Sequence, residues 1–309
     1  MKVLMIYAKN EYTTAVYYED SLRRNSEIQL LTAGIGNVDI QTPQEFTIVE
    51  LLSRIDPPEL IFYVQGHSPL AIHGLELSPI PVIFYGIDTH MQKEYLFDIA
   101  KKCMFTFFAQ KPAVEEFRKI KDSVDWLPLA CEPLKHFPMN LDMKYDVAFV
   151  GGTDLAEAHL KRRELLKAIQ KRHTLWVGRA MGIFLTKIYN HSKIVFNCSV
   201  RNDLNMRVFE ALACKKLLIT DSLSAESGLN EFFEDGKHLI LYDSEKDMLE
   251  KIDYYLKNDK ERELIANQGY QEVISKHTYD IRIQLNLFGK INEIIKKTRE
   301  NLLSRTFRK

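Results

Sequence analysis

The sequence predicts an α/β protein built from two Rossmann-like halves. Short apolar strands alternate with helix-type segments along the chain, which is the pattern of a doubly wound parallel sheet. The alternation is interrupted at residues 132–138, where Pro133 and Pro138 cannot sit in a continuing helix or central strand. A second series begins at Tyr145, and a length of 309 residues suits two domains of about 150 residues.

The first half opens on an apolar strand over residues 1–7, which Lys9 interrupts at once. Thr42-Pro43-Gln44-Glu45 resembles a capped helix start, so we expect a helix over residues 46–55. The other expected strands are 27–32, 60–64, 81–85, 103–107 and 125–129, and the other helices are 13–24, 94–101 and 113–120.

The second half repeats strand, turn and helix. Gly151-Gly152-Thr153 forms the first turn, and Gly178-Arg179 the second. The expected strands are 146–150, 174–177, 194–196 and 217–220, and the expected helices are 156–170, 205–214, 246–256, 260–274 and 279–303. Asn258-Asp259 is a suitable cap for the fourth of these helices, and the last is long and amphipathic.

Residues 193–221 form a strand, loop, helix and strand that organise the second half. The helix is apolar nearly all round, which is typical of a buried helix, and Asp203 or Asn205 can cap its start. Arg207 and Glu210 are neighbours on one face, so they either pair or face a cleft, because an isolated buried charge is costly. A helix that starts just beyond a parallel strand directs its free N–H groups at the crevice where α/β sheets bind anions.

The helix residues and several later segments resemble those of a known enzyme family. Residues 197–221, together with Gly236-Lys237-His238, residues 239–242 and the stretch 259–270, resemble the C-terminal signature of CgeB-like glycosyltransferases. The resemblance is specific over about residues 145–277. It implies the GT-B fold of the family-4 retaining group, with two Rossmann-like domains that face a cleft. In that group a Glu-x7-Glu motif includes the helix Glu; Glu210 matches its second member, and Asn202 stands where the first would be.

The resemblance implies an N-terminal acceptor-side domain at 1–138, a nucleotide-sugar-binding domain at 139–277, and a helix at 278–309 that crosses back to the first domain. It further implies transfer of a hexosyl group from a nucleoside-diphosphate sugar, with retention. The donor is then a substrate, and no cofactor is expected. The acceptor, whether saccharide, protein or lipid-linked, is not predicted, and neither is the oligomeric state.

In this interpretation Arg207 neutralises the diphosphate and Glu210 accepts hydrogen bonds from the ribose, as catalytic residues; an ordinary helix pair of these two residues is the alternative. Gly151-Gly152-Thr153 lets the backbone approach a phosphate, or is a plain turn. The expected donor-binding residues are Gly151, Gly152, Thr153, Arg179, Asn202, Asp203, Leu204, Asn205, Met206, Arg207 and Glu210.

Two strand ends of the first half supply further candidates. Asp88 and His90 follow the strand at 81–85 and are expected to be catalytic: His90 toward the donor sugar or phosphate, and Asp88 toward His90 or the acceptor. The alternative is a helix cap at Asp88 beside a surface histidine. Gln65-Gly66-His67 ends the strand at 60–64, and Gln65 or His67 could meet the acceptor.

Composition limits the function. Lys plus Arg and Asp plus Glu both number 42, so nothing indicates a nucleic-acid partner. The four cysteines are widely spaced, which suggests neither a zinc site nor a disulfide framework, so we expect reduced thiols and a cytoplasmic location. No Asp-x-Asp motif occurs, so we expect no catalytic metal. Arg305, Arg308 and Lys309 end the chain as a basic tail that makes at most a weak membrane contact. A sugar-nucleotide epimerase and a non-catalytic binding module of the same fold are the alternative functions.

Overall fold

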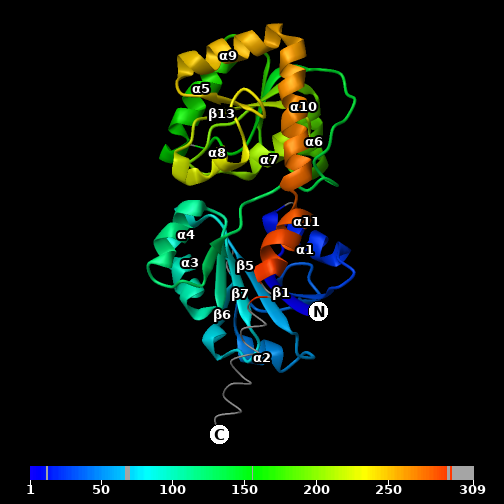
Figure 1. Cartoon of the computed structure of the whole chain (residues 1–309), viewed down its shortest axis with the longest axis vertical. Helices are drawn as coiled ribbons and strands as arrows, with labels where there is room; N and C mark the ends of the chain where they lie inside the picture. The colour runs from blue at the N-terminus through cyan, green and yellow to red at the C-terminus, as the bar shows by residue number, and fades with distance from the viewer. Residues whose placement is uncertain (12, 67–69, 155, 291–292, 294–309) are drawn as a thin grey trace.

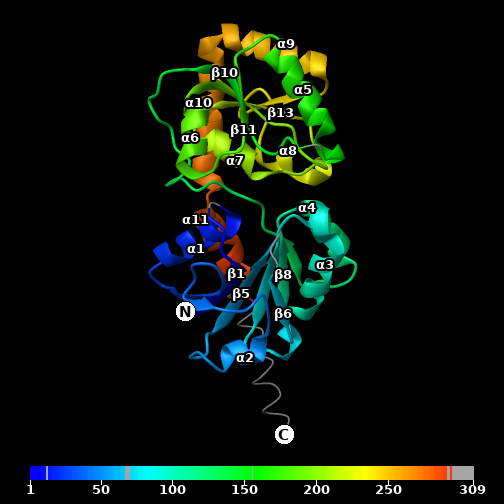
Figure 2. The same cartoon turned by 180° about the vertical axis from the view of Figure 1, so that it is seen from behind.

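The computed structural model describes residues 1–11, 13–66, 70–154, 156–290 and 293. The two α/β halves of the molecule are stacked along its long axis, and each consists of a parallel sheet with helices on both faces (Figures 1 and 2). Each half is called a layer below. This arrangement confirms the predicted α/β class with two Rossmann-like halves. Within these described ranges, no helix is both long and apolar enough to cross a membrane.

The first sheet has seven parallel strands, and its order reverses between β1 and β5. Ligands bind outside the carboxyl ends of the strands at such a switch point, because the chain leaves the two strands toward opposite faces. Every residue of β5 is buried, as expected for an interior strand. The strands in spatial order are β3 (Ile40–Gln41), β2 (Gln29–Ile35), β1 (Lys2–Ala8), β5 (Leu60–Gln65), β7 (Val82–Gly86), β8 (Phe105–Phe108) and β9 (Val124–Trp126).

The predicted helix at 46–55 is wrong at both ends. Glu45–Thr47 is strand β4, which pairs with β6 (Ala71–His73), and helix α2 covers only Ile48–Leu52. The start of α2 is set by a capping box in which the Thr47 hydroxyl accepts from the Glu50 N–H and the Glu50 carboxylate accepts from the Thr47 N–H. The other helices of this half are α1 (Thr14–Arg24), α3 (Thr89–Lys102) and α4 (Lys111–Arg118), with a 3₁₀ turn at Leu75–Leu77.

The second sheet has five parallel strands, and its order reverses between β10 and β12. Its strands in spatial order are β11 (Leu175–Gly178), β10 (Tyr145–Val150), β12 (Ser192–Phe196), β13 (Leu217–Asp221) and β14 (Ile240–Tyr242). Its helices are α5 (Leu160–Gln170), α6 (Gly182–Asn190), α7 (Met206–Ala213), α8 (Leu229–Phe232), α9 (Glu245–Lys257) and α10 (Asp259–Lys276), with 3₁₀ turns at Glu157–His159 and Ala225–Ser227. Helix α6 was not predicted.

The chain passes between the two layers twice, and the two crossings lie side by side. The Cys131 N–H donates to the carbonyl of His277 at 3.0 Å, and the Tyr279 N–H donates to the carbonyl of Cys131 at 3.1 Å. Buried Glu132 accepts from Arg24 of α1 at 2.9 Å. The boundary predicted at residue 138 falls between the two sheets and stays a prediction.

The chain end predicted as a long helix at 279–303 is helical at residues 279–290 and 293, and residues 291–292 and 294–303 lie outside the described residues. Helix α11 covers Tyr279–Ile281 and continues as a π-helical segment over Arg282–Phe288, packed against α1 beside the first sheet (Figures 1 and 2). Asn258 occupies the predicted N-cap position of α10, but its side chain makes no capping hydrogen bond and donates instead to the carbonyl of Tyr254 at 2.8 Å. The basic tail at Arg305, Arg308 and Lys309 lies outside the described residues.

Candidate active site

The switch points of both sheets meet at one cavity of about 440 Å³. From the first sheet, the ends of β1, β5 and β7 and the start of α1 line it; from the second, the start of α7 does. Thr13, Thr14 and Ala15 line the cavity, and the Thr13 side chain makes no capping hydrogen bond, so the uncapped N-terminus of α1 borders this space. Two helix N-termini therefore direct positive potential into one space, which suits an anion. The lining residues include Tyr7, Thr13, Thr14, Gly66, Asp88, Asp203, Asn205, Met206, Arg207 and Glu210.

Arg207 spans the switch point of the second sheet. Its Nε donates to the carbonyl of Val150 at the end of β10 at 2.5 Å, and its Nη1 donates to Oδ1 of Asn197, just beyond β12. The guanidinium also lies over the Phe149 ring, with its central carbon 4.7 Å from the ring centroid. These contacts hold a positive charge at the wall of the cavity, where the predicted diphosphate would lie.

Local sequence explains the position of Arg207. The Asn205 side chain accepts from the Arg207 N–H at 3.2 Å, which makes Asn205 the observed cap of α7. Gly151 follows β10, and a Cβ atom at this position would overlap the guanidinium of Arg207. Gly151 therefore makes room for the arginine, a role that the predicted phosphate contact did not include. Thr153 borders neither this cavity nor the adjacent one described below.

Glu210 lies deeper in the same cavity and is 8 % exposed. It does not form the ordinary helix pair with Arg207, because the guanidinium turns toward Val150 and Asn197. Burial raises the pKa of the Glu210 carboxyl to about 7, although the Arg207 charge acts in the opposite direction. The nearest basic group is Nε2 of His136, which lies 3.6 Å from Oε1 of Glu210.

Asp88 and His90 are brought to two adjacent cavities rather than one. Asp88 lines the main cavity with φ at 60°, and its side chain does not cap α3. His90 lines a neighbouring cavity of about 250 Å³, where its Nδ1 is buried without a hydrogen-bond partner among the described residues. Asp203 borders both cavities, and its Oδ1 accepts from Gln110 Nε2 at 3.1 Å. Burial raises the pKa of Asp203, and His90 acts to lower it.

Asn202 and Leu204 line the smaller cavity with His90. Both amide atoms of Asn202 bond to Ser224: Oδ1 accepts from the Ser224 N–H at 2.7 Å, and Nδ2 donates to the hydroxyl. Asn202 and Arg201 both have positive φ. The Arg201 side chain donates to the carbonyl of His90 at 2.6 Å, so this loop joins the two layers directly.

Arg179 lies farther out, along an open groove of about 600 Å³ that also includes Trp176 and Phe184. Asn10 borders both this groove and the main cavity, so the groove extends the cleft. The Arg179 guanidinium pairs with Asp154 at 3.3 Å, and its side chain is 73 % exposed. Gly152 packs near the Arg179 and His159 side chains, and its carbonyl accepts from buried Arg162 at 2.7 Å. Arg162 thus orders the loop after β10.

Several site residues were not predicted. Thr13 and Thr14 follow the first strand and lie at the start of α1. The pattern that indicated Asp203 and Asn205, a polar residue at the start of a helix just beyond a parallel strand, would also have indicated these two residues. Thr14 donates to the sulfur of Met206 at 3.1 Å across the cleft. No local signal marks His136, because its position depends on the path of the linker. His67 lies outside the described residues, and Gln65 is buried at the end of β5, where its Nε2 donates to the carbonyl of Leu70 at 3.1 Å.

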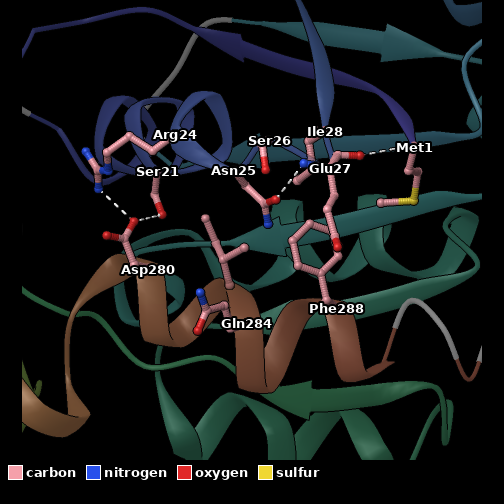
Figure 3. Close-up of a pocket in the computed structure, with 11 residues that line it drawn as sticks. Met1, Ser21, Arg24, Asn25, Ser26, Glu27, Ile28, Asp280, Gln284 and Phe288 are labelled. Atoms are coloured by element: carbon pink, nitrogen blue, oxygen red, sulfur yellow. Dashed lines mark hydrogen bonds and ion pairs between the residues drawn. The ribbon is translucent and has the colours of Figure 1, made fainter.

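A larger cavity of about 710 Å³ lies away from the cleft, between the end of α1 and the π-helical segment (Figure 3). Its charged groups bind one another: Arg24 pairs with Asp280 at 2.7 Å, and Ser21 also donates to Asp280. The Met1 ammonium group donates to the carbonyl of Glu27 at 2.7 Å. The charged groups of this cavity therefore already pair with one another, whereas among the described residues no Lys or Arg lies within 4.0 Å of the Glu210 carboxylate.

The comparisons with known proteins concern the second half of the chain and the overall fold. Residues 152–287 match the glycosyl transferase-like family. The matched region includes α5 to α11 and therefore the Arg207 and Glu210 side of the cavity. No curated protein matches the sequence. In the described ranges there is no group of three or more His, Cys, Asp or Glu side chains placed to hold a metal ion.

Solved structures resemble the chain over almost its full length. The sucrose-phosphate synthase of Thermosynechococcus elongatus aligns with a TM-score of 0.65 at 10 % identity, over 96 % of this chain and 99 % of its own. A glycosyltransferase from Rickettsia africae aligns with a TM-score of 0.65 at 11 % identity, over 96 % of this chain and 98 % of its own. Anabaena HepE in complex with UDP-glucose aligns with a TM-score of 0.64 at 10 % identity, over 98 % of this chain and 100 % of its own. At these identities the likeness concerns the fold, which is GT-B.

Proposed function

We propose that the protein is a glycosyltransferase of the CgeB-like kind, which moves a hexosyl group from a nucleoside-diphosphate sugar to an acceptor hydroxyl, with retention and without a metal. The observation that carries this proposal is the meeting of the two switch points at one cavity, with Arg207 across the second. HepE and an α-glucosyltransferase, both structurally similar, were solved with UDP-glucose, which supports a donor of this class.

The leaving group in this reaction is a nucleoside diphosphate, whose negative charge grows as the glycosidic bond breaks. Arg207 and the N-terminus of α7 are placed to stabilise that charge, and the N-terminus of α1 faces it across the cavity. Both Arg207 and the helices are fixed before substrate binds, since other contacts hold them, so little reorganisation is required at the moment of reaction.

The ribose and the sugar of the donor would lie on opposite sides of its diphosphate. Glu210, when ionised, accepts hydrogen bonds from the ribose hydroxyls. His90 and Asn202, in the smaller cavity, face the donor sugar. Asp88, at the end of β7, faces the acceptor hydroxyl, and Asp203 lies between the two cavities. The acceptor is a saccharide, a protein or a lipid-linked group, and the sequence and the cavity do not select among them.

The four cysteines are free and buried thiols. A reducing compartment keeps such thiols free, so we propose that the reaction takes place in the cytoplasm.

A thermal-shift panel of nucleoside-diphosphate sugars tests the proposed function. A true donor at 100 times its Kd stabilises the native state by about 2.7 kcal/mol and raises the melting temperature, whereas other sugars do not. The donor is then incubated with the protein, and the products are identified by mass spectrometry. Transfer to an acceptor or slow release of the sugar supports the proposal. An altered nucleotide sugar without acceptor indicates an epimerase, and binding without turnover indicates a non-catalytic module.

A further inference from the structure

His136 lies in the linker between the two sheets and is 0 % exposed. Its Nδ1 accepts a hydrogen bond from the backbone N–H of Glu132 at 3.3 Å, and its ring meets that of Tyr17 edge-on at 5.5 Å. Burial lowers the pKa of the imidazole to about 4, with a smaller effect from Lys135, so the ring is neutral at pH 7. A neutral ring that accepts at Nδ1 carries its hydrogen on Nε2.

The Nε2–H group points at Glu210. The distance from Nε2 to Oε1 of Glu210 is 3.6 Å, slightly longer than a hydrogen bond, and Nε2 has no hydrogen-bond partner among the described residues. A buried N–H without a partner is unfavourable, and so is a buried carboxylate without a donor. A shift of about 0.5 Å brings the pair to hydrogen-bond distance and satisfies both groups.

We propose that His136 is the positioning residue of Glu210: it donates its Nε2–H to Oε1 of the ionised carboxylate and leaves Oε2 for the ribose hydroxyls of the donor. The proposal rests on the proposed function, in which Glu210 holds the ribose. A carboxylate accepts in several directions, so one oxygen can be held by the protein while the other binds substrate.

The linker keeps His136 in place. The carboxylate of Glu132 accepts from Arg24 at 2.9 Å and from the Leu134 N–H at 3.2 Å, and the His136 N–H donates to the Glu132 carbonyl at 2.8 Å. The imidazole is therefore a fixed donor, and Glu210 is the group that it orients.

The other groups that face Glu210 come from three helices. Arg207 of α7 favours the ionised carboxylate, and Cys214 just after α7, Tyr189 of α6 and Tyr279 of α11 are close enough to interact with it. Burial raises the pKa of each of these three acidic groups, so they stay neutral near pH 7. His136 is then the neutral donor whose removal leaves the charge of Arg207 unchanged.

The first test needs no ligand. Glutamate labelled with ¹³C at the carboxyl is incorporated, the Glu210 signal is assigned by its loss in Glu210→Gln, and its ionisation is followed from pH 5 to 9. A donor to the charged form favours ionisation, so His136→Phe moves the midpoint to higher pH, and His136→Gln, which keeps an N–H donor, moves it back. Leu134→Ala, at an exposed position of the same linker, is the matched control and leaves the midpoint unchanged. An unchanged midpoint in His136→Phe overturns the proposal.

The second test uses calorimetry with the common ribonucleoside diphosphates and their 2′,3′-dideoxy forms. For the nucleotide that wild type binds, His136→Phe raises Kd of the ribose form about threefold to tenfold and leaves the dideoxy form unaffected, and His136→Gln restores part of the loss. Equal weakening of both forms means that His136 acts on overall folding and overturns the proposal. If wild type binds none of these nucleotides, the proposed function fails, while the carboxyl titration still decides the His136–Glu210 contact.

Discussion

Trp126 of β9 stacks face to face on Phe232 of α8, with ring centroids 4.9 Å apart and ring planes 8° from parallel. One residue belongs to the first sheet and the other to a helix of the second half, so the stack joins the two layers. Lys111 reinforces it, since its ammonium lies 5.4 Å from the Trp126 ring centroid and pairs with Glu231. This contact is separate from the two chain crossings.

The stacking predicts an energetic coupling between the two rings. Aromatic pairs contribute about 0.5 to 1.5 kcal/mol beyond their buried area. A double-mutant cycle of Trp126→Ala and Phe232→Ala should return a coupling of this size in the free energy of unfolding, measured by urea denaturation with circular dichroism. Strictly additive effects would show that the rings do not stabilise each other.

Replacement of Arg207 or Glu210 should remove most transfer activity from a folded protein. Arg207→Ala loses a charge-assisted contact to the diphosphate, which costs roughly 1.5 to 3 kcal/mol, or about tenfold to a hundredfold in rate. Glu210→Gln loses the anionic acceptor for the ribose and should fall in the same range. Turnover is measured with the donor found by thermal shift, and Arg172→Ala, at an exposed site away from the cleft, is the control. Normal turnover in both cleft variants would place the site elsewhere.

Activity should survive removal of divalent metals. The phosphate charge is assigned to Arg207 and helix N-termini, so a metal has no essential part. The protein is dialysed against EDTA and assayed with and without added Mg²⁺ or Mn²⁺. Complete loss after dialysis, followed by recovery with either ion, would contradict the assignment.

Asn202→Ala should weaken binding of the intact nucleotide sugar by about 1 kcal/mol while the free nucleoside diphosphate binds nearly as in wild type. Because Asn202 is bonded to Ser224, the variant also loosens this loop. Ser224→Ala removes one bond of the pair and keeps the Asn202 amide, so it separates loop tethering from sugar contact. Calorimetric titration with both ligands distinguishes the two roles. If Asn202→Ala and Ser224→Ala lose the same affinity for the nucleotide sugar, Asn202 only tethers the loop and does not contact the sugar.

The stability of the protein should depend on the ionisation of Glu210. Burial raises the pKa of Glu210 to about 7, above that of about 4.3 in an unfolded chain, so the folded state binds the proton more tightly. Stability from this group is present below about pH 4.3 and is lost as the pH rises to about 7. Glu210→Gln removes this loss, so its stability relative to wild type should increase over that range, by on the order of 2 kcal/mol, and stay level above it. Urea denaturation from pH 5 to 8 measures the difference, and a difference that does not change with pH would contradict the raised pKa.

Local patterns in the sequence predicted the elements whose structure depends on neighbouring residues. The apolar interior strands and α7 were predictable because their apolar runs and the Asn205 cap lie within a few residues, whereas the short strands β3, β4 and β6 were not predicted. The start of α2 was not, since Thr42 and Thr47 both precede a glutamate three residues on, and only the pairing of β4 with β6 decides between them. The helical periodicity after Tyr279 predicted a helix there, but nothing in the sequence indicated that Arg282–Phe288 would be π-helical.

The candidate site was predictable on the side of the second sheet and less so at the contacts between the layers. Arg207 and Glu210 were found because two charges interrupt an apolar helix. Their separation, with one side chain turned to Val150 and the other toward His136, depends on packing that no local pattern records. Asp88 and His90 are two residues apart in the sequence, yet the positive φ of Asp88 and the kink at Gln92 send them to different cavities.

The two adjacent crossings determine how the halves of the molecule can move. Because hydrogen bonds join Cys131 to His277 and Tyr279, the crossings together define a single axis of rotation, and sliding or twisting of one half past the other would stretch one of them. Rotation about that axis separates α4 from α8, which lie on the far side of the crossings in both views (Figures 1 and 2). The Trp126–Phe232 stack and the hydrogen bonds of Arg201 with His90 and of Gln110 with Asp203 also join the halves, so these contacts would have to part together for the proposed donor to enter by this rotation.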